Sequence, residues 1–255
     1  MGIDNSHVDS PVYREAVGSG IVKVVMQDRV NKNTFSPALV SGMQAMFTDL
    51  NGDKSCKVVI LTGYDSYFSS GGTLNGLRDL YQGKSRFTDS DLYSLALNCP
   101  VPVISAMQGH GIGGGFVLGM FADFPILSLE SIYTTNFMKY GFTPGMGSTL
   151  ILPYRLGPCL SQEMMLSAKN YRGIDLKQRG VPFPVVPRNS VVSHAVNLAE
   201  SIADKPRESL VTLKKHLISE VKEKLARAIE DEIKMHEQTI HSPEVKQRVE
   251  TTFGQ

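Results

Sequence analysis

Short runs of aliphatic and β-branched residues alternate with amphipathic segments in the first half of the chain. Ser36 followed by Pro37 has the order of a helix N-cap and first helical position, which predicts a helix to about Leu50. Strands separated by helical segments indicate βαβ units and a largely parallel sheet. Four runs predict strands: 21–26 (IVKVVM), 58–62 (VVILT), 103–107 (VISAM) and 124–128 (FPILS).

The pattern changes after about Asn189. Residues 190–203, 206–221 and 222–241 have helical periodicity, are rich in Lys and Glu, and contain no strand pattern. Helices of this length need an apolar surface to rest on, which favours packing on a neighbouring subunit over a merely solvated face. We therefore expect an α/β core over residues 1–190 and a helical region over residues 191–255.

Composition narrows the class of protein. With 255 residues, 42% of them hydrophobic and 20% charged, the chain can build one large core, which excludes disorder as its main state. Lys and Arg (26) nearly equal Asp and Glu (25), so the net charge of +1 argues against nucleic acid or an acidic membrane surface as a partner. The three cysteines have neither CxxC nor zinc-site spacing.

Location follows from the same features. We read the cysteines as reduced thiols and expect a cytoplasmic protein. The first thirteen residues lack the basic and then apolar order of a signal peptide. The longest weakly charged apolar stretch, 111–122, is too short to span a bilayer.

Five glycines occupy the seven positions 109–115 (GHGIGGG), directly after the predicted strand 103–107. Glycines allow a ligand to approach the backbone closely and leave N–H groups free at a helix start, where negative charge is favoured. A tight strand-to-helix turn would also need small residues. Two functional interpretations compete: a GxGxxG dinucleotide loop with Glu130 about 20 residues on, or half of an oxyanion hole.

A second loop, 63–73, also leaves a predicted strand and enters a helix through adjacent glycines, Gly71 and Gly72. The ends of neighbouring parallel strands lie at one edge of a sheet, so the two loops are expected side by side. Two such turns can direct two N–H groups at one oxygen. The pair of loops is more specific than either loop alone.

The ordered segments VVILTG, YFSSGG, PVISAMQGHGIGGG and YGFTPGMGST resemble those of the enoyl-CoA hydratase, or crotonase, superfamily, and the resemblance runs from about Val12 to Phe253. It implies an α/β spiral of repeated ββα turns and a C-terminal helical region that forms a homotrimer. It also implies acyl thioester substrates, with the backbone N–H groups of Gly72 and Gly114 as the oxyanion hole.

Two departures from the superfamily pattern change the expected reaction. Hydratases of this family carry catalytic glutamates where this chain has Val117 and Phe137, and neither side chain can move a proton. The segments MQGHGIGGGFVLGMFAD, NFMKYGFTPGMG and PRESLVTLKKHL are most similar to the decarboxylases of polyketide β-branching, of the bacillaene type. The resemblance implies decarboxylation of 3-methylglutaconyl to 3-methylcrotonyl thioester on an acyl carrier protein, following a dehydratase.

This chemistry needs two oxyanion donors, a general acid and a cation for the leaving carboxylate, so we expect neither a metal nor an organic cofactor. His236 is the expected acid: it lies on the apolar stripe of the last predicted helix, and the resemblance places a functional histidine there. His110 is a weaker alternative that would support its turn, and His241 lies off the stripe. The resemblance suggests that Arg86 or Lys84 binds the substrate carboxylate; alternatively, both are solvated charges. An apolar wall of the pocket is expected from Val117, Phe137 and Tyr140.

Three alternatives stay open at this point. The missing glutamates also fit a catalytically silent subunit that binds an acyl carrier protein within a polyketide synthase complex. An enoyl-thioester isomerase or hydratase, and an oxidoreductase that uses GxGxxG for a dinucleotide, are the others. An acidic carrier protein would need only a local basic patch, which we expect near Lys84, Arg86 and the Lys-rich tail.

Overall fold

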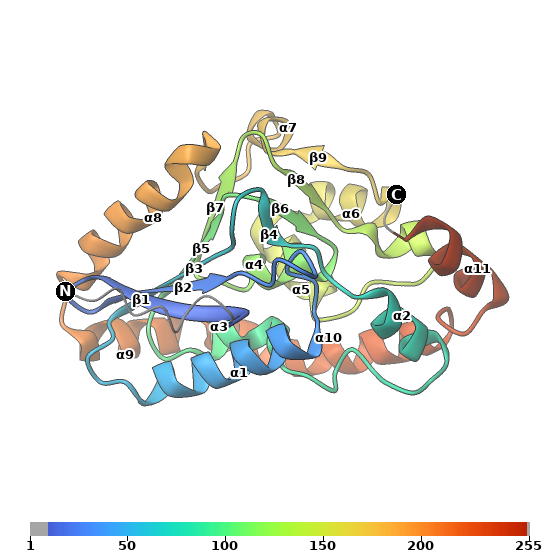
Figure 1. Cartoon of the computed structure of the whole chain (residues 1–255), viewed down its shortest axis with the longest axis horizontal. Helices are drawn as coiled ribbons and strands as arrows, with labels where there is room; N and C mark the ends of the chain where they lie inside the picture. The colour runs from blue at the N-terminus through green and yellow to red at the C-terminus, as the bar shows by residue number, and fades with distance from the viewer. Residues whose placement is uncertain (1–9, 254–255) are drawn as a thin grey trace.

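The computed structural model describes residues 10–253 and contains two sheets (Figure 1). The larger sheet has the strand order β1-β2-β3-β5-β7-β10, and its neighbours are parallel except for β1 and β2. All four predicted strands are confirmed in this sheet. Its strands are β1 (Val12–Gly18), β2 (Ile21–Met26), β3 (Val58–Thr62), β5 (Val103–Met107), β7 (Phe124–Ser128) and β10 (Val185–Val186).

A smaller sheet has the order β4-β6-β8-β9, formed by β4 (Tyr67–Ser69), β6 (His110–Ile112), β8 (Ile132–Thr134) and β9 (Tyr171–Arg172). The chain repeats one unit: a long strand of the first sheet, a short strand of the second, then a helix. The helices are α2 (Leu74–Tyr81), α4 (Gly114–Met120) and the 3-10 helix η3 (Asn136–Tyr140). The predicted spiral of ββα turns is confirmed.

Alternate residues of the large sheet face two different layers. Val59 and Leu61 of β3 point into the main core, whereas Val58 and Ile60 pack under α8 (Arg188–Ala203). Helix α8 therefore covers one face of the sheet (Figure 1). It begins at Arg188, shortly before the expected 190/191 boundary between core and helical region; that boundary stays a prediction, although α8 itself packs on the sheet.

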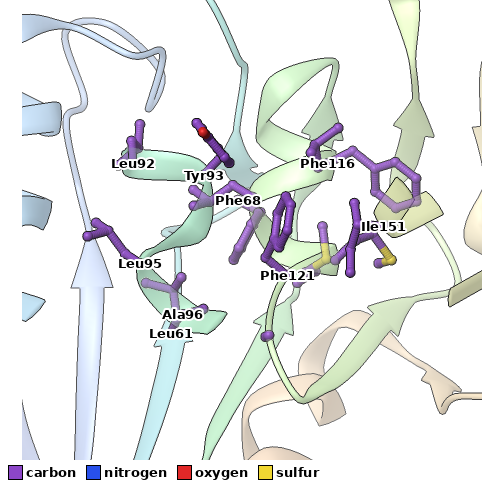
Figure 2. Close-up of a cluster of buried hydrophobic side chains, with 14 of the residues drawn as sticks. Leu61, Phe68, Leu92, Tyr93, Leu95, Ala96, Phe116, Phe121 and Ile151 are labelled. Atoms are coloured by element: carbon purple, nitrogen blue, oxygen red, sulfur yellow. The ribbon is translucent and has the colours of Figure 1, made fainter. Parts of the chain in front are cut away.

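The other face of the sheet carries the main core. Helix α1 (Pro37–Gly52) begins as predicted: the Ser36 side chain accepts from the Leu39 N–H, and Pro37 is the first helical residue. Figure 2 shows part of this core; its Tyr93 and Phe121 rings lie 5.8 Å apart between centroids. The remaining elements here are η2 (Leu92–Ser94), α3 (Leu95–Asn98), α5 (Ser148–Leu156), α6 (Pro158–Ser167) and α7 (Gly173–Gln178).

The C-terminal region is helical, as predicted, with α9 (Arg207–Leu217), α10 (Ser219–Glu237) and α11 (Pro243–Thr252). The predicted break between the second and third helices at 221/222 is wrong by a few residues and lies at Ile218. Helix α11 contacts α2 and η3, so it closes the end of the spiral (Figure 1). Among residues 10–253, no helix has the length and apolar character needed to cross a membrane.

Candidate active site

The two glycine loops lie side by side, because they follow strands that pair in parallel. Ser69 of β4 is in register with Gly111 of β6, and each strand leads through glycines into a helix. A Cβ atom at Gly71 would lie 2.5 Å from the carbonyl oxygen of Ile112 and 3.4 Å from the amide nitrogen of Gly114. Only a residue without a side chain allows this approach, and the φ of +75° at Gly71 also favours glycine.

Both predicted oxyanion-hole residues have free N–H groups. Neither the Gly72 nor the Gly114 amide donates a hydrogen bond to any other group of residues 10–253. Gly114 is the first residue of α4, where an amide has no intrahelical acceptor. Both residues line the same cavity. The structure therefore brings together two unpaired backbone donors at its wall.

This cavity has a volume of about 820 Å³, enough for an acyl thioester with part of its pantetheine arm. Its wall comes from the two loops, the segment 85–93, η3, the segment after η3, and α10. Phe137 and Tyr140 lie on this wall, as expected, and Tyr140 stacks on Phe142 at 6.0 Å between ring centroids. Burial raises the pKa of the Tyr140 hydroxyl, so it stays protonated.

Val117 does not lie on this wall. Its side chain is fully buried and packs in the main core, because it lies on the inner face of α4 whereas the N-terminus of α4 meets the cavity. The expected pocket role of Val117 is therefore corrected to a core role. Of the two positions that hold glutamate in hydratases, only Phe137 faces the cavity.

His236 lies on α10 and is 7% exposed. Its Nδ1 lies 3.1 Å from the Thr143 carbonyl oxygen; a carbonyl can only accept, so Nδ1 carries a hydrogen and donates it. The edges of Phe87 and Phe142 pack on the imidazole at 4.9 and 5.4 Å between centroids. Its Nε2 is buried with no hydrogen-bond partner among the described residues, and His236 lines the cavity.

These surroundings define the chemistry available to the imidazole. Burial lowers the pKa of His236 below its usual value, while the Thr143 carbonyl opposes this by favouring the charged ring. The neutral ring keeps its hydrogen on Nδ1, which leaves the lone pair on Nε2. A second proton, bound at Nε2, would make His236 a general acid inside the cavity.

Arg86 and Lys84 are separated by the structure. Arg86 lines the cavity, its side chain is 66% exposed, and its Nε lies 3.8 Å from Oε1 of Glu237, the residue after His236. Lys84 is exposed and does not line the cavity; its backbone N–H donates to the Asp79 carbonyl. Arg86 is therefore the cation of this pair that reaches the cavity.

The other two candidate histidines, His110 and His241, have structural partners, although His110 also lines the cavity. Nδ1 of His110 accepts from the Ile132 N–H at 2.9 Å, so this side chain supports the strand pairing of its loop. His241 is exposed, as expected, and its Nε2 lies 3.1 Å from Glu237. Glu130, the partner proposed for a dinucleotide loop, instead accepts from the Ser128 hydroxyl and the Arg188 N–H in the turn after β7.

Several residues that line the cavity were not predicted from the sequence. Tyr93, Phe87 and Asn136 line the wall, but each belongs to a loop or a short 3-10 helix without periodicity. Glu232, buried on α10, was also missed. Its spacing of three residues from Ile229 and four from His236 puts it on the buried stripe, which was the signal available in the sequence.

A spiral of ββα units whose two glycine loops open on one thioester-sized cavity defines a crotonase-type α/β protein. Consistent with that class, the profile of the Enoyl-CoA hydratase/isomerase family matches residues 16–253, so the chain belongs to this family. The resemblance seen in the sequence is confirmed.

Individual relatives narrow the comparison. The chain is 56% identical over 238 residues to the bacillaene synthase decarboxylase PksI of Bacillus subtilis, covering 93% of this chain and 96% of that one. A solved structure of a dehydratase/decarboxylase couple of polyketide β-branching matches with a TM-score of 0.96 and 55% identity, over 96% of this chain and 100% of that one. The ECH2 decarboxylase domain of CurF from Lyngbya majuscula matches with a TM-score of 0.93 and 44% identity, over 96% and 100%.

Proposed function

We propose that this protein is a decarboxylase of polyketide β-branching that converts 3-methylglutaconyl thioester, carried on an acyl carrier protein, to 3-methylcrotonyl thioester. The observation that carries the proposal is the buried, unpartnered Nε2 of His236, a residue that lines the same cavity as Gly72 and Gly114. The 56% identity to a decarboxylase supports the reaction class.

Breaking the carbon–carbon bond to the carboxylate releases CO2 and leaves its electron pair on the substrate. Conjugation spreads this pair over a dienolate and onto the thioester oxygen. The N–H groups of Gly72 and Gly114 stabilise that oxygen, by roughly 3 to 4 kcal/mol per donor in comparable oxyanion holes. These donors are part of the chain, so we propose that no metal or organic cofactor takes part.

The dienolate then takes one proton, which balances the reaction. We assign this proton to Nε2 of protonated His236, and solvent restores it before the next turnover. Hydratases of this family, by contrast, are expected to activate water with glutamate carboxylates, at the positions where this chain has Val117 and Phe137. Among the described residues that line the cavity, Asp89 is the only carboxylate, and it accepts from the Arg86 N–H at 2.8 Å. This arrangement favours decarboxylation over hydration.

Arg86 is the proposed partner of the substrate carboxylate. Arg86 lines the cavity, and among residues 10–253 its guanidinium has one weak partner, Glu237 at 3.8 Å, so it can exchange Glu237 for the substrate. A guanidinium holds a carboxylate by two parallel N–H bonds, which fixes the orientation of the bond that breaks.

The assembly in which the protein works is also part of the proposal. The substrate class requires an acyl carrier protein, and a dehydratase must supply the unsaturated thioester. By family likeness we propose a homotrimer in the cytoplasm, formed through the C-terminal helices. The exposed Leu213 and Leu217 of α9 are apolar residues available for such a contact.

The direct test is incubation with 3-methylglutaconyl thioester on an acyl carrier protein, followed by intact-mass spectrometry. We expect loss of the mass of one CO2, and we expect it to be strongly slowed in His236→Gln, which retains a side-chain N–H for the Thr143 carbonyl. A folded wild-type protein that releases no CO2 above the protein-free background refutes the proposal. Binding of the carrier protein without turnover would instead identify a silent carrier-binding subunit.

A further inference from the structure

Helix α10 is fastened to the segment 143–149 at two points, one helical turn apart. His236 donates through Nδ1 to the Thr143 carbonyl, and four residues earlier Glu232 binds the other end of the same segment. Thr239 adds a third link, since its hydroxyl accepts from the Thr143 N–H at 3.3 Å. The position of the imidazole therefore depends on how α10 sits against this segment.

Glu232 is 1% exposed, and both of its carboxylate oxygens are used. Oε2 accepts from the Gly147 N–H at 2.7 Å; Oε1 accepts from the Thr149 N–H at 2.8 Å and from the Thr149 hydroxyl at 2.6 Å. These amides lie at the start of α5, where no intrahelical acceptor exists. Burying a carboxylate is costly, and an apolar residue would serve if the site needed packing alone. The three hydrogen bonds that Glu232 accepts therefore indicate that it holds this segment in a fixed geometry.

The same segment forms part of the cavity wall. Gly145 and Met146 lie on the wall between the Thr143 and Gly147 bonds. A Cβ atom at Gly145 would lie 2.7 Å from the ring of Phe87, and Phe87 packs edge-on against His236. A displacement of this segment therefore moves both the acceptor of Nδ1 and the aromatic contact of the imidazole.

We propose that Glu232 is a positioning residue for His236: by holding Gly147 and Thr149 it fixes α10 against the segment 143–149, so that Thr143 keeps the hydrogen on Nδ1 and Nε2 faces the cavity. This inference rests on the role proposed above for His236. Glu232 is not among the described residues that line the cavity. It acts through the segment and the helix.

The test replaces Glu232 by glutamine, which keeps the size but exchanges one acceptor oxygen for an NH2 group. One of the amides at Gly147 and Thr149 then has no acceptor. We expect kcat to fall roughly 10- to 100-fold, the cost of a displacement of about 1 Å in a reacting group, and KM to change less than about twofold. Glu230→Gln, an exposed change on the same helix, is the matched control and should leave both constants unchanged.

Histidine nitrogen NMR reads the position of His236 without substrate. In the wild-type protein we expect one neutral tautomer, with hydrogen on Nδ1, and a titration below the usual pKa because the ring is buried. In Glu232→Gln the ring gains water and loses its fixed acceptor, so we expect mixed tautomers and a pKa nearer to the usual value. The signal is assigned by its absence in His236→Gln.

A second pair of variants keeps the inference testable if Glu232→Gln does not fold. Thr149→Val removes only the hydroxyl bond to Glu232, and we expect a fall in kcat of about threefold that Thr149→Ser restores. The inference is overturned if the folded Glu232→Gln variant has a normal kcat and an unchanged His236 titration. It is also overturned if Thr149→Val changes neither kcat nor the His236 titration. Absence of turnover in the wild type refutes the decarboxylase, while the NMR comparison still decides the role of Glu232.

Discussion

Replacing Gly72 or Gly114 by alanine tests the assignment of the two oxyanion-hole donors, because the room for a Cβ atom differs between the two positions. A Cβ atom at Gly114 would lie 2.7 Å from both Sδ of Met146 and Cε2 of Phe35, closer than the 3.0 Å below which a neighbour must shift. Both neighbours line the cavity. At Gly72 the nearest atom is Cδ2 of Leu77 at 3.5 Å, an ordinary contact.

The expected magnitudes follow from these distances. Neither glycine has a positive φ, so alanine fits both backbones and keeps both N–H groups. For Gly114→Ala, overpacking costs about 1 to 3 kcal/mol and moves the wall against which the thioester oxygen rests. Because loss of one oxyanion donor costs about 100- to 1000-fold in kcat, we expect roughly a 100-fold decrease in kcat/KM. For Gly72→Ala we expect less than about a threefold decrease.

The assay is decarboxylation of the thioester at several substrate concentrations, with thermal unfolding of each variant as the control for folding. A folded Gly114→Ala variant with wild-type kcat/KM would refute the placement of the reacting oxygen beside Gly114. Equal losses in both variants would also contradict the reasoning, since only one of the two sites is overpacked.

His236→Gln should lower kcat by about 100- to 10,000-fold, and in the wild type kcat/KM should fall about tenfold per pH unit above the pKa of His236, because only the protonated ring is the acid. Burial holds the pKa of His236 below the usual value of a histidine, so we expect the decline to begin below neutral pH; a rate that rises through this range contradicts the role. Arg86→Met should lower kcat/KM by about 10- to 100-fold, the loss of one charge-assisted pair, whereas Lys84→Met should change it less than twofold; the reverse result would exchange the two roles. Lys214→Met removes the 2.7 Å ion pair to Asp123, which is largely buried and, among the described residues, then keeps only the hydrogen bond from the Val103 N–H; we expect about 3 kcal/mol lower free energy of unfolding in urea, and an unchanged transition midpoint argues against this ion pair.

Four of the six strands of the large sheet were predictable, because burial makes them nearly continuous apolar runs; β1, which is largely exposed, and β10, which has two residues, were not predicted. The strands of the small sheet were not, since β6 has three residues, one of them glycine, and no period can be recognised over that length. Strand β6 is ordered by its pairing with β4 and β8, which is a tertiary interaction that the local sequence does not encode. The glycine loops were predictable because two backbones that approach closely need glycines, and a cluster of glycines is visible in the sequence. Phe87 and Tyr93 lie in irregular segments, which carry no such signal.

The choice between Arg86 and Lys84 illustrates the same limit. Both are long cations two residues apart in one loop, and the sequence offers no period that assigns them to a face. The structure separates them through local bonds: the Arg86 amide donates to the Asp89 carboxylate, and the Lys84 amide donates to the Asp79 carbonyl. The prediction that Val117 lines the pocket was wrong for a different reason. Resemblance to a family assigns a residue to a position in the chain, but it does not define the direction in which the side chain packs.

The lowered pKa of His236 is compatible with its proposed role as an acid once the charge of the substrate is included. In the empty cavity burial disfavours the imidazolium ion, so the ring is mostly neutral near pH 7. A bound carboxylate supplies the missing counter-charge and favours the proton on Nε2. When CO2 leaves, that counter-charge becomes a dienolate whose carbon can accept a proton, and the buried ring again favours its neutral form. The burial that weakens the base in the free protein therefore drives protonation of the product, and it does so only after decarboxylation.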